Sequence, residues 1–371
     1  MLKPQYLQRV PDAMLELYGE AETAVLEDMA RRINGYDYFI PAAQHQLRML
    51  EAMGAAREEI LGQLAALTGK SSRELERIMR EAGMEAVRAD DMVYKAAGLT
   101  PAPLAASPAM QRILRAGLAK TRGLFDNLTR TTATTASHQF ERALDKAYME
   151  ITSGAFSPQE AVQRAVKGLC RQGVNAIEYQ GGHRDSMDVA VRRAVVTGVN
   201  QTAMQMQTAR ADELGVDLVE TTAHAGARPS HAEWQGRIFS RSGRSRKYPN
   251  FVSSTGYGTG EGLGGWNCSH SFRPYVEGMP RAYSRELLRE YEAEDYEYNG
   301  RKMTEYEALQ RQREIERNIR RWKREKQAIA AIGGDTSEAA AKLRQWNGTQ
   351  KDFLEQTGLK RQYSREAVPK P

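Results

Sequence analysis

The sequence has 371 residues, of which 41% are hydrophobic and 27% charged, so it is long enough for two or three domains that each bury a core. Its two cysteines exclude the disulfide framework of a small secreted domain, and no apolar segment approaches the roughly 18 residues of a transmembrane helix. The net charge of +6, from 53 basic and 47 acidic side chains, permits an acidic partner without establishing one. We therefore expect a soluble protein of a reducing cytoplasm, without a signal peptide or membrane anchor.

The N-terminal part of the chain has the composition and spacing of helices. Over residues 12–97 apolar side chains recur at helical intervals, and an antiparallel set of helices is predicted, with interruptions at Gly35, at Pro41 and at the segment "TGKSS". Ser71 and Glu74 have the spacing of a capping box, which predicts a helix start at that point.

Helical sequence continues after a proline-rich linker over residues 98–108. A second long helical stretch is predicted over residues 109–153, with an interruption at "TRTTATTAS", because threonine hydroxyls offer the backbone competing hydrogen bonds. The next helix is predicted to begin at Ser157 and Pro158 and to end at Gly173.

The pattern changes near Ile177. A helix is predicted over residues 186–214 with Gly215 as its end, and "VDLVETTAH" directly behind it alternates like a strand with one buried face. From there to about Val276, glycine, serine, proline and aromatic residues predict loops and short strands. Charged helices are expected from Pro280 to about Ile332, and the segments "GGDTSEAAAKLRQW" and "NGTQKDFLEQTGLK" predict two more.

These elements predict a mainly α protein with a small mixed α/β (α+β) domain. We expect a helical N-terminal region over residues 1–175, the small loop-rich, strand-containing domain over 176–280, and a charged helical C-terminal region over 281–371.

The small domain carries most of the unusual chemistry. Three of the six histidines, one of the two cysteines and two of the four tryptophans lie between His224 and His270. One thiolate and three imidazoles are acceptable zinc ligands, which makes His224, His231, Cys268 and His270 a candidate metal set. The stretch has neither a Cys-x-x-Cys motif nor a histidine pair at helical spacing. We therefore expect no cofactor, although the pattern could hold zinc.

Other interpretations of this stretch compete with the metal site. The "HAE" containing Glu233 is similar to the zinc deaminase pattern, although the second cysteine and the proline are missing. Cys268 could act as a nucleophile with His231 or His270 as its base. "GEGLGG" formally matches a dinucleotide loop, but "WNCSHSF" follows it and predicts a strand instead of the required helix. No catalytic residue is therefore assigned, and the simplest interpretation is a set of loops held by hydrogen bonds.

Taken together, these segments resemble the phage minor capsid protein 2 family, which is related more distantly to the Mu F-like head-morphogenesis proteins. The resemblance extends from residue 185 to about residue 360, through "GARPSHAEWQGRIFS", "YGTGEGLGGWNCSHSF", "LQRQREIERNIRRWKRE" and "WNGTQKDFLEQTGL". The positions that match the family motif are Arg228, His231, Trp234, Gln235, Gly236, Asn267, Cys268 and His270.

The resemblance implies a minor capsid (head) protein of a tailed phage, made in the host bacterial cytoplasm and present in the virion in few copies at the portal vertex. It implies the portal protein as a partner, the major capsid protein or scaffold as further candidates, and a role in head assembly or genome delivery. The helical N-terminal region is the expected portal-binding part. No enzymatic activity is implied.

Packaged double-stranded DNA is a further expected partner. Residues 301–326 carry ten basic and five acidic side chains, and Ile315, Ile319 and Trp322 define an apolar stripe that should face protein. Exposed arginines beside that stripe would neutralise phosphates without reading sequence. The candidates for DNA contact are Arg313, Arg317, Arg320, Arg321 and Arg324.

Two alternatives remain open at the level of function. The first is a metal-dependent hydrolase or nuclease built on His224, His231, Cys268 and His270, and the second is a DNA-binding protein outside the virion. Metal content and the effect of removing a ligand would separate a structural site from a catalytic one.

Overall fold

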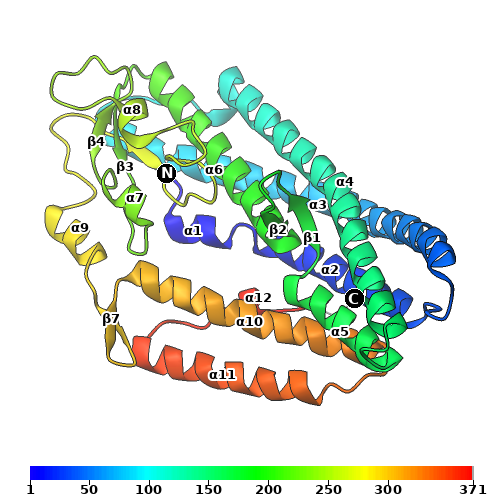
Figure 1. The fold of residues 1–371 in the computed structure, drawn as a ribbon. Helices are drawn as coiled ribbons and strands as arrows, with labels where there is room; N and C mark the ends of the chain where they lie inside the picture. The colour runs from blue at the N-terminus through cyan, green and yellow to red at the C-terminus, as the bar shows by residue number, and fades with distance from the viewer. Residues whose placement is uncertain (370–371) are drawn as a thin grey trace. The chain divides into compact units, whose positions relative to one another are not determined.

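The computed structural model describes residues 1–369, and most of them are helical (Figure 1). The expectation of a mainly α fold with a small α+β part is confirmed. The helices are α1 (Pro4–Arg9), α2 (Asp12–Asn34), α3 (Ala42–Ala96), the 3-10 helix η1 (Leu104–Ala106), α4 (Pro108–Thr152), α5 (Pro158–Gln172), α6 (Met187–Glu213), α7 (Pro229–Ala232), α8 (Phe251–Thr255), α9 (Arg285–Tyr291), α10 (Glu305–Ala331), α11 (Ser337–Thr357) and α12 (Tyr363–Glu366). The strands are β1 (Asn175–Glu178), β2 (Arg184–Ser186), β3 (Leu218–Thr221), β4 (Ile238–Ser240), β5 (Phe272–Pro274), β6 (Tyr296–Tyr298) and β7 (Arg301–Met303).

The chain forms two compact units, and each combines separate stretches of sequence. Unit 1 contains residues 1–14, 72–124 and 192–309. Unit 2 contains residues 15–71, 125–191 and the chain from Gln310 onward. The three-region domain division drawn from composition stays a prediction.

Unit 1 contains a three-stranded antiparallel sheet in the order β4-β3-β5. Because alternate side chains of a strand point to opposite faces, the sheet buries one row of apolar residues. A core cluster joins that row to Met204 of α6, since methionine fills irregular gaps between a helix and a sheet. The buried members of the cluster are Met204, Val219, Trp234, Phe239, Phe251, Leu263 and Phe272.

Within unit 1, α6 also packs on helical neighbours. Met206 forms a core cluster with Val87 of α3 and Met110 of α4. The Gln207 side chain donates a 2.8 Å hydrogen bond to the buried Asp90 carboxylate of α3 and another of 2.8 Å to the Phe272 carbonyl of β5. One face of α6 is therefore tied to both a helix and the sheet.

Unit 2 is built mainly from helices. Its apolar cluster brings together Ala30 of α2, Val166 and Cys170 of α5, and Ala328 and Ile329 of α10. The Gln312 amide of α10 donates to the Lys360 carbonyl just after α11, and the two helices run alongside each other in Figure 1.

The predicted start of α5 is confirmed in detail. Ser157 accepts a hydrogen bond from the Glu160 amide, and the Glu160 carboxylate accepts one from the Ser157 amide, which completes a capping box. Pro158 occupies the first helical position, and Gly173 follows the last turn with a φ of 73°.

Two predicted interruptions of the long helices are wrong. Helix α3 continues through Ser71, whose hydroxyl donates to the Thr68 carbonyl instead of capping a new helix. Helix α4 continues through the threonine-rich segment, because the Thr135 hydroxyl donates to the Thr131 carbonyl at 2.9 Å, and Thr131 to Asn127 at 3.1 Å. These hydroxyls find acceptors one turn back within the helix, so they do not break it.

The C-terminal elements also differ from the prediction. The charged stretch after Pro280 is interrupted by the hairpin of β6 and β7, whose turn places Asn299 and Gly300 at φ values of 52° and 76°. An Asn-Gly pair between short strands is a strong hairpin signal, so the sequence did contain this information. The last two predicted helices form one continuous helix, α11, which runs through Gly348.

Candidate metal centre

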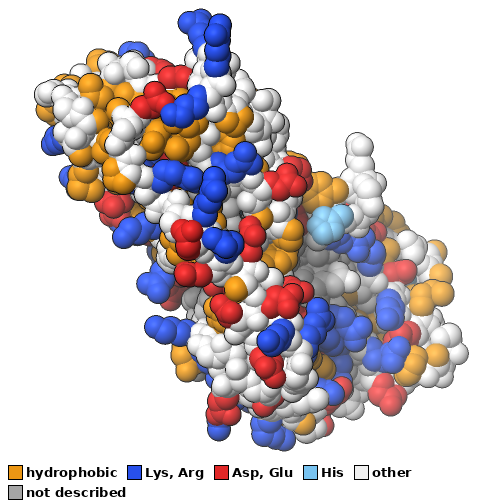
Figure 2. Space-filling view, turned by 90° about the vertical axis from the view of Figure 1, so that its left-hand side faces the viewer, with side chains coloured by type: hydrophobic (Ala, Val, Ile, Leu, Met, Phe, Trp, Pro, Cys, Tyr) orange, Lys and Arg blue, Asp and Glu red, His pale blue; other side chains and the backbone are white. Residues whose placement is uncertain are grey.

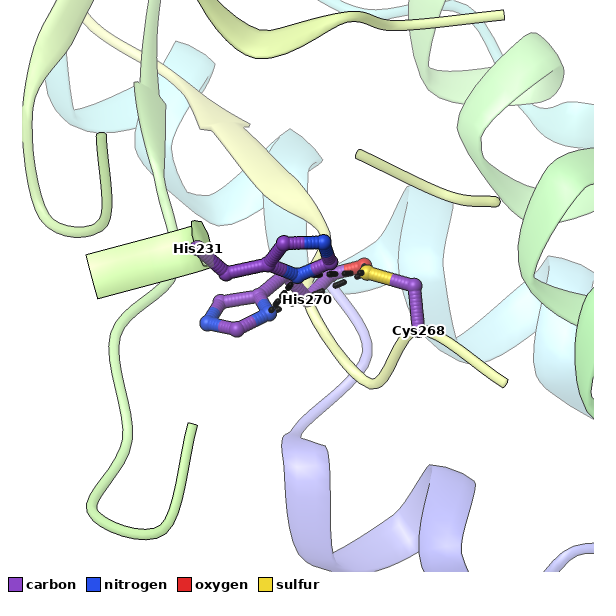
Figure 3. A group of neighbouring side chains, drawn as sticks. All are labelled: His231, Cys268 and His270. Atoms are coloured by element: carbon purple, nitrogen blue, oxygen red, sulfur yellow. Dashed lines mark hydrogen bonds between the residues drawn. The ribbon is translucent and has the colours of Figure 1, made fainter. Parts of the chain in front are cut away.

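Three side chains of unit 1 converge in the interior, as Figure 3 shows. His231 lies on the short helix α7, which begins with Pro229 at its first position. Cys268 and His270 lie on the segment that connects α8 to β5. Each of the three residues is only 2% exposed. The Cys-x-His pair and the distant histidine therefore form one buried cluster.

The potential ligand atoms of the cluster form a nearly equilateral triangle. Sγ of Cys268 lies 3.7 Å from Nδ1 of His231 and 3.7 Å from Nδ1 of His270. The two Nδ1 atoms lie 3.5 Å apart. All three atoms are thus directed at the same small volume.

The outer nitrogen of each ring has a hydrogen-bond acceptor. Nε2 of His231 lies 2.9 Å from the Glu261 carbonyl, and Nε2 of His270 lies 3.2 Å from Oε1 of Gln235. An oxygen acceptor requires the proton on Nε2, so a neutral ring has an unprotonated Nδ1. Both rings are in this way held with a lone pair directed toward Cys268.

Burial favours the neutral form of both rings. The pKa of His270 is well below its usual range because the ring is desolvated, and the neighbouring His224 and His231 lower it further. Desolvation also lowers the pKa of His231, although the hydrogen bond to the Glu261 carbonyl raises it. Desolvation raises the pKa of the Cys268 thiol in the absence of a cation. A nearby cation would reverse that effect, because it stabilises the thiolate.

Backbone contacts hold the Cys-x-His segment in place. The Asn200 side chain of α6 donates to the carbonyls of Cys268 at 3.0 Å and His270 at 2.8 Å. Asn267 adopts a φ of 53°, which asparagine tolerates better than most residues. The sequence analysis did not identify Asn200. A polar residue within the apolar pattern of a predicted buried helix could have indicated it, because buried polar side chains need hydrogen-bond partners.

His224 is separate from the triangle. Its Nδ1 lies 2.7 Å from the Ala225 carbonyl, and its ring centroid lies 4.4 Å from that of His270. Its Nε2 is buried, and no hydrogen-bond partner for it exists within residues 1–369. Of the four predicted metal ligands, the structure brings together three, and His224 is their neighbour.

The other motif residues surround the cluster. The Trp234 ring packs at 4.7 Å from the His231 ring and 4.8 Å from the His270 ring. Arg228 donates to the Trp266 carbonyl at 3.0 Å. Gly236 has a φ of 63°, and a Cβ there would lie 2.7 Å from a methyl carbon of Leu288, so a larger residue would strain the backbone and displace that side chain. These residues shape the site without entering the triangle.

Glu233, considered as a proton shuttle, is exposed. Among the described residues the only group of histidine, cysteine or carboxylate side chains close enough to share an ion is His231, Cys268 and His270. The arrangement can therefore hold a cation, but it presents no carboxylate to a metal-bound water.

The arginine candidates on α10 have different surroundings. Arg324 is 7% exposed and forms a 3.0 Å ion pair with Glu22, so the expectation that it is exposed is wrong. Arg320 pairs with Asp188 at 2.5 Å, and the Arg321 guanidinium lies over the Trp322 ring. Arg313 is half-buried, and Arg317 is exposed. The predicted apolar stripe is confirmed, because Ile315, Ile319 and Trp322 are all buried.

Comparison with known proteins gives a consistent result. The sequence model of the family described as "Phage minor capsid protein 2" matches residues 2–355. A protein of Lactococcus phage LL-H named "Structural protein" is 26% identical over 346 residues, which cover 87% of this chain and 88% of that protein. A "Structural protein" of Lactococcus phage mv4 is 37% identical over 125 residues, 33% of this chain and 93% of that protein. No solved structure matches.

Proposed function

The chain belongs to the phage minor capsid protein 2 family, and we propose on this basis that it is a minor head protein of a tailed-phage virion, located at the portal vertex. In this proposal it is made in the host bacterial cytoplasm, enters the head in few copies, and acts in head assembly or genome delivery. The observation that carries the proposal is the extent of the family match, which includes the helical N-terminal region as well as the Cys–His segment. The match to the phage LL-H protein over most of both chains supports it.

The N-terminal helical region is the proposed portal-binding part. Its exposed large apolar side chains include Phe39, Leu47 and Leu50, which lie within twelve residues of one another. Exposed apolar side chains that lie close in sequence favour a protein contact, and the portal protein is the proposed partner, with the major capsid protein or scaffold as further candidates. No helix within residues 1–369 has the length and apolar character to cross a lipid bilayer.

We also propose that exposed arginines contact packaged double-stranded DNA without sequence preference. Figure 2 shows Lys and Arg side chains in several groups on one face, with Asp and Glu side chains between them. Such a surface suits weak, dispersed phosphate contacts rather than one continuous DNA-binding groove.

A hydrolase or nuclease built on the cluster is less well supported. Its side chains are almost fully buried, and a polymer substrate would have no access to them without rearrangement. A family named for a capsid protein likewise favours a structural role over an enzymatic one.

The first experiment is quantitative peptide mass spectrometry on purified phage particles, with the major capsid protein as internal reference. We expect this chain at a small fraction of the major capsid protein's copy number, and chemical cross-links between residues 37–50 and the portal protein. Absence from mature particles would contradict a virion role, and copy numbers equal to those of the major capsid protein would contradict a place at a single vertex.

A further inference from the structure

We infer that His231, Cys268 and His270 bind one zinc ion through Nδ1, Sγ and Nδ1. This inference goes beyond the proposed capsid role and does not depend on it, because it concerns the isolated chain. The ion would be structural, joining helix α7 to the segment between α8 and β5.

The spacing of the three atoms fits a tetrahedral zinc site. With Zn–N bonds of about 2.0–2.1 Å and a Zn–S bond of about 2.3 Å, tetrahedral angles place two nitrogens about 3.4 Å apart and a nitrogen and a sulfur about 3.6 Å apart. The corresponding distances here are 3.5 Å, 3.7 Å and 3.7 Å. One ion at the centre could bond to all three atoms with only small shifts.

The count of protons makes the cluster unfavourable without an ion. Glu261 and Gln235 hold both ring protons on Nε2, so two Nδ1 lone pairs and a sulfur face one another in the interior. The thiol has a single proton and can donate it to one of the two nitrogens, which leaves the other lone pair buried without a donor. A cation satisfies all three atoms at once, because thiolate and neutral imidazole are both metal-binding forms.

The donor atoms select the metal. A thiolate with two imidazoles suits zinc, whereas calcium and magnesium prefer oxygen ligands, and the cluster offers none from its side chains. Three protein ligands leave one tetrahedral position for a water molecule. The buried Nε2 of His224 offers such a water an acceptor beside the His270 ring.

The position of the ligands explains what the ion would stabilise. Cys268 and His231 are 37 residues apart in sequence, and the chain between them consists mostly of loops. A bond through zinc would close this long loop and order a region that has few regular hydrogen-bonded elements.

The test is the metal content of the purified full-length chain by inductively coupled plasma mass spectrometry. We expect one zinc per chain in the natural protein and in Cys170→Ala, which removes the other buried cysteine. We expect at least a tenfold loss of zinc in Cys268→Ser and His270→Ala. A folded, metal-free natural protein that also takes up no added zinc would overturn the inference, as would full zinc content in Cys268→Ser.

Cobalt exchange keeps the test valid if the ligand variants fail to fold. Cobalt(II) in the natural protein should give the intense visible bands of a tetrahedral site and a thiolate charge-transfer band in the near ultraviolet. A pale, octahedral-type spectrum without the thiolate band would overturn the assignment. His224→Ala should retain zinc. A loss of zinc as large as that of Cys268→Ser would show that His224 is a fourth ligand and would overturn the three-ligand assignment. The copy number in particles has no bearing on these results, so the two proposals fail separately.

Discussion

At the scale of single residues, charge and burial are in conflict at Glu316 of α10. This residue is 2% exposed, and its Oε1 has no hydrogen-bond partner among the residues described. Burial raises the pKa of Glu316 to about 7, although the Arg365 guanidinium, 4.0 Å from Oε2, lowers it. The nearby Glu366 raises this pKa, and Arg313 and Arg320 lower it. Glu316 is therefore partly neutral near physiological pH.

The raised pKa makes a prediction about stability. A carboxyl whose pKa is higher in the folded than in the unfolded chain stabilises the fold at low pH, and this contribution is lost as the pH rises toward about 7. Glu316→Gln removes this titratable group. Between about pH 5 and pH 8 the free energy of unfolding of the variant should therefore rise relative to that of the natural protein by on the order of 1–3 kcal/mol. Urea unfolding across that range measures the difference. A difference that does not change with pH would show that Glu316 titrates normally.

At the scale of elements, α4 and α6 approach each other through paired glycines and threonines. A Cβ at Gly198 would lie 2.5 Å from Oγ1 and 2.9 Å from Cγ2 of Thr121, and a Cβ at Gly117 would lie 2.7 Å from Cγ2 of Thr202. Each threonine hydroxyl donates at 2.8 Å to the glycine carbonyl one turn earlier in its own helix. The close packing of these helices in unit 1 therefore depends on the absence of two side chains.

Gly198→Ala should destabilise unit 1. Alanine gains about 1 kcal/mol of helix propensity over glycine, but overpacking of a close contact costs about 1–3 kcal/mol, and we expect a net loss of up to about 2 kcal/mol. The control is Gly123→Ala on α4, where a Cβ meets nothing within 4 Å. The control should gain about 0.5–1 kcal/mol in chemical denaturation. Equal effects of the two substitutions would contradict the packing argument.

Local signals predicted some elements and missed others for identifiable reasons. The start of α5 was predictable because Ser157, Pro158 and Glu160 act within one turn. The similar pair Ser71 and Glu74 gave a wrong prediction of a helix start. The apolar stripe of α3 is buried both before and after Ser71, and this packing keeps the helix continuous. A cap is thus decided by the tertiary contacts of the neighbouring turns as well as by its own residues.

At the scale of the whole molecule, several basic side chains, two of the predicted DNA-contact arginines among them, have acidic partners. Arg324 pairs with Glu22, Arg320 with Asp188, and Arg241 with Asp212. Exposed arginines remain at positions 244, 246 and 317. The net charge of +6 is therefore spread over many exposed side chains of both signs.

DNA binding should therefore be weak, independent of sequence and steeply dependent on salt. We expect binding to a random-sequence duplex at about 50 mM salt and a large decrease in affinity by about 200 mM. The dependence of the logarithm of affinity on the logarithm of salt concentration measures the number of phosphate contacts. The double variant Arg244→Gln/Arg246→Gln should reduce the magnitude of this slope by about 2, because each arginine that is replaced leaves one phosphate without its cation. Arg77→Gln is the control, because Arg77 is exposed but already bridges Glu74 and Glu81. Absence of binding at the lower salt would contradict the DNA proposal.

The sequence by itself determined the mainly α class, the end of α6 before Gly215, and the Cys-x-His pair, because these depend on residue spacing along the chain. The tertiary structure alone decided that His231 joins that pair while His224 remains beside it. It also decided that Arg324 is buried against Glu22, a residue 302 positions away. Local preferences can be recognised from adjacent residues, whereas burial and pairing depend on which distant segments the packed core brings together.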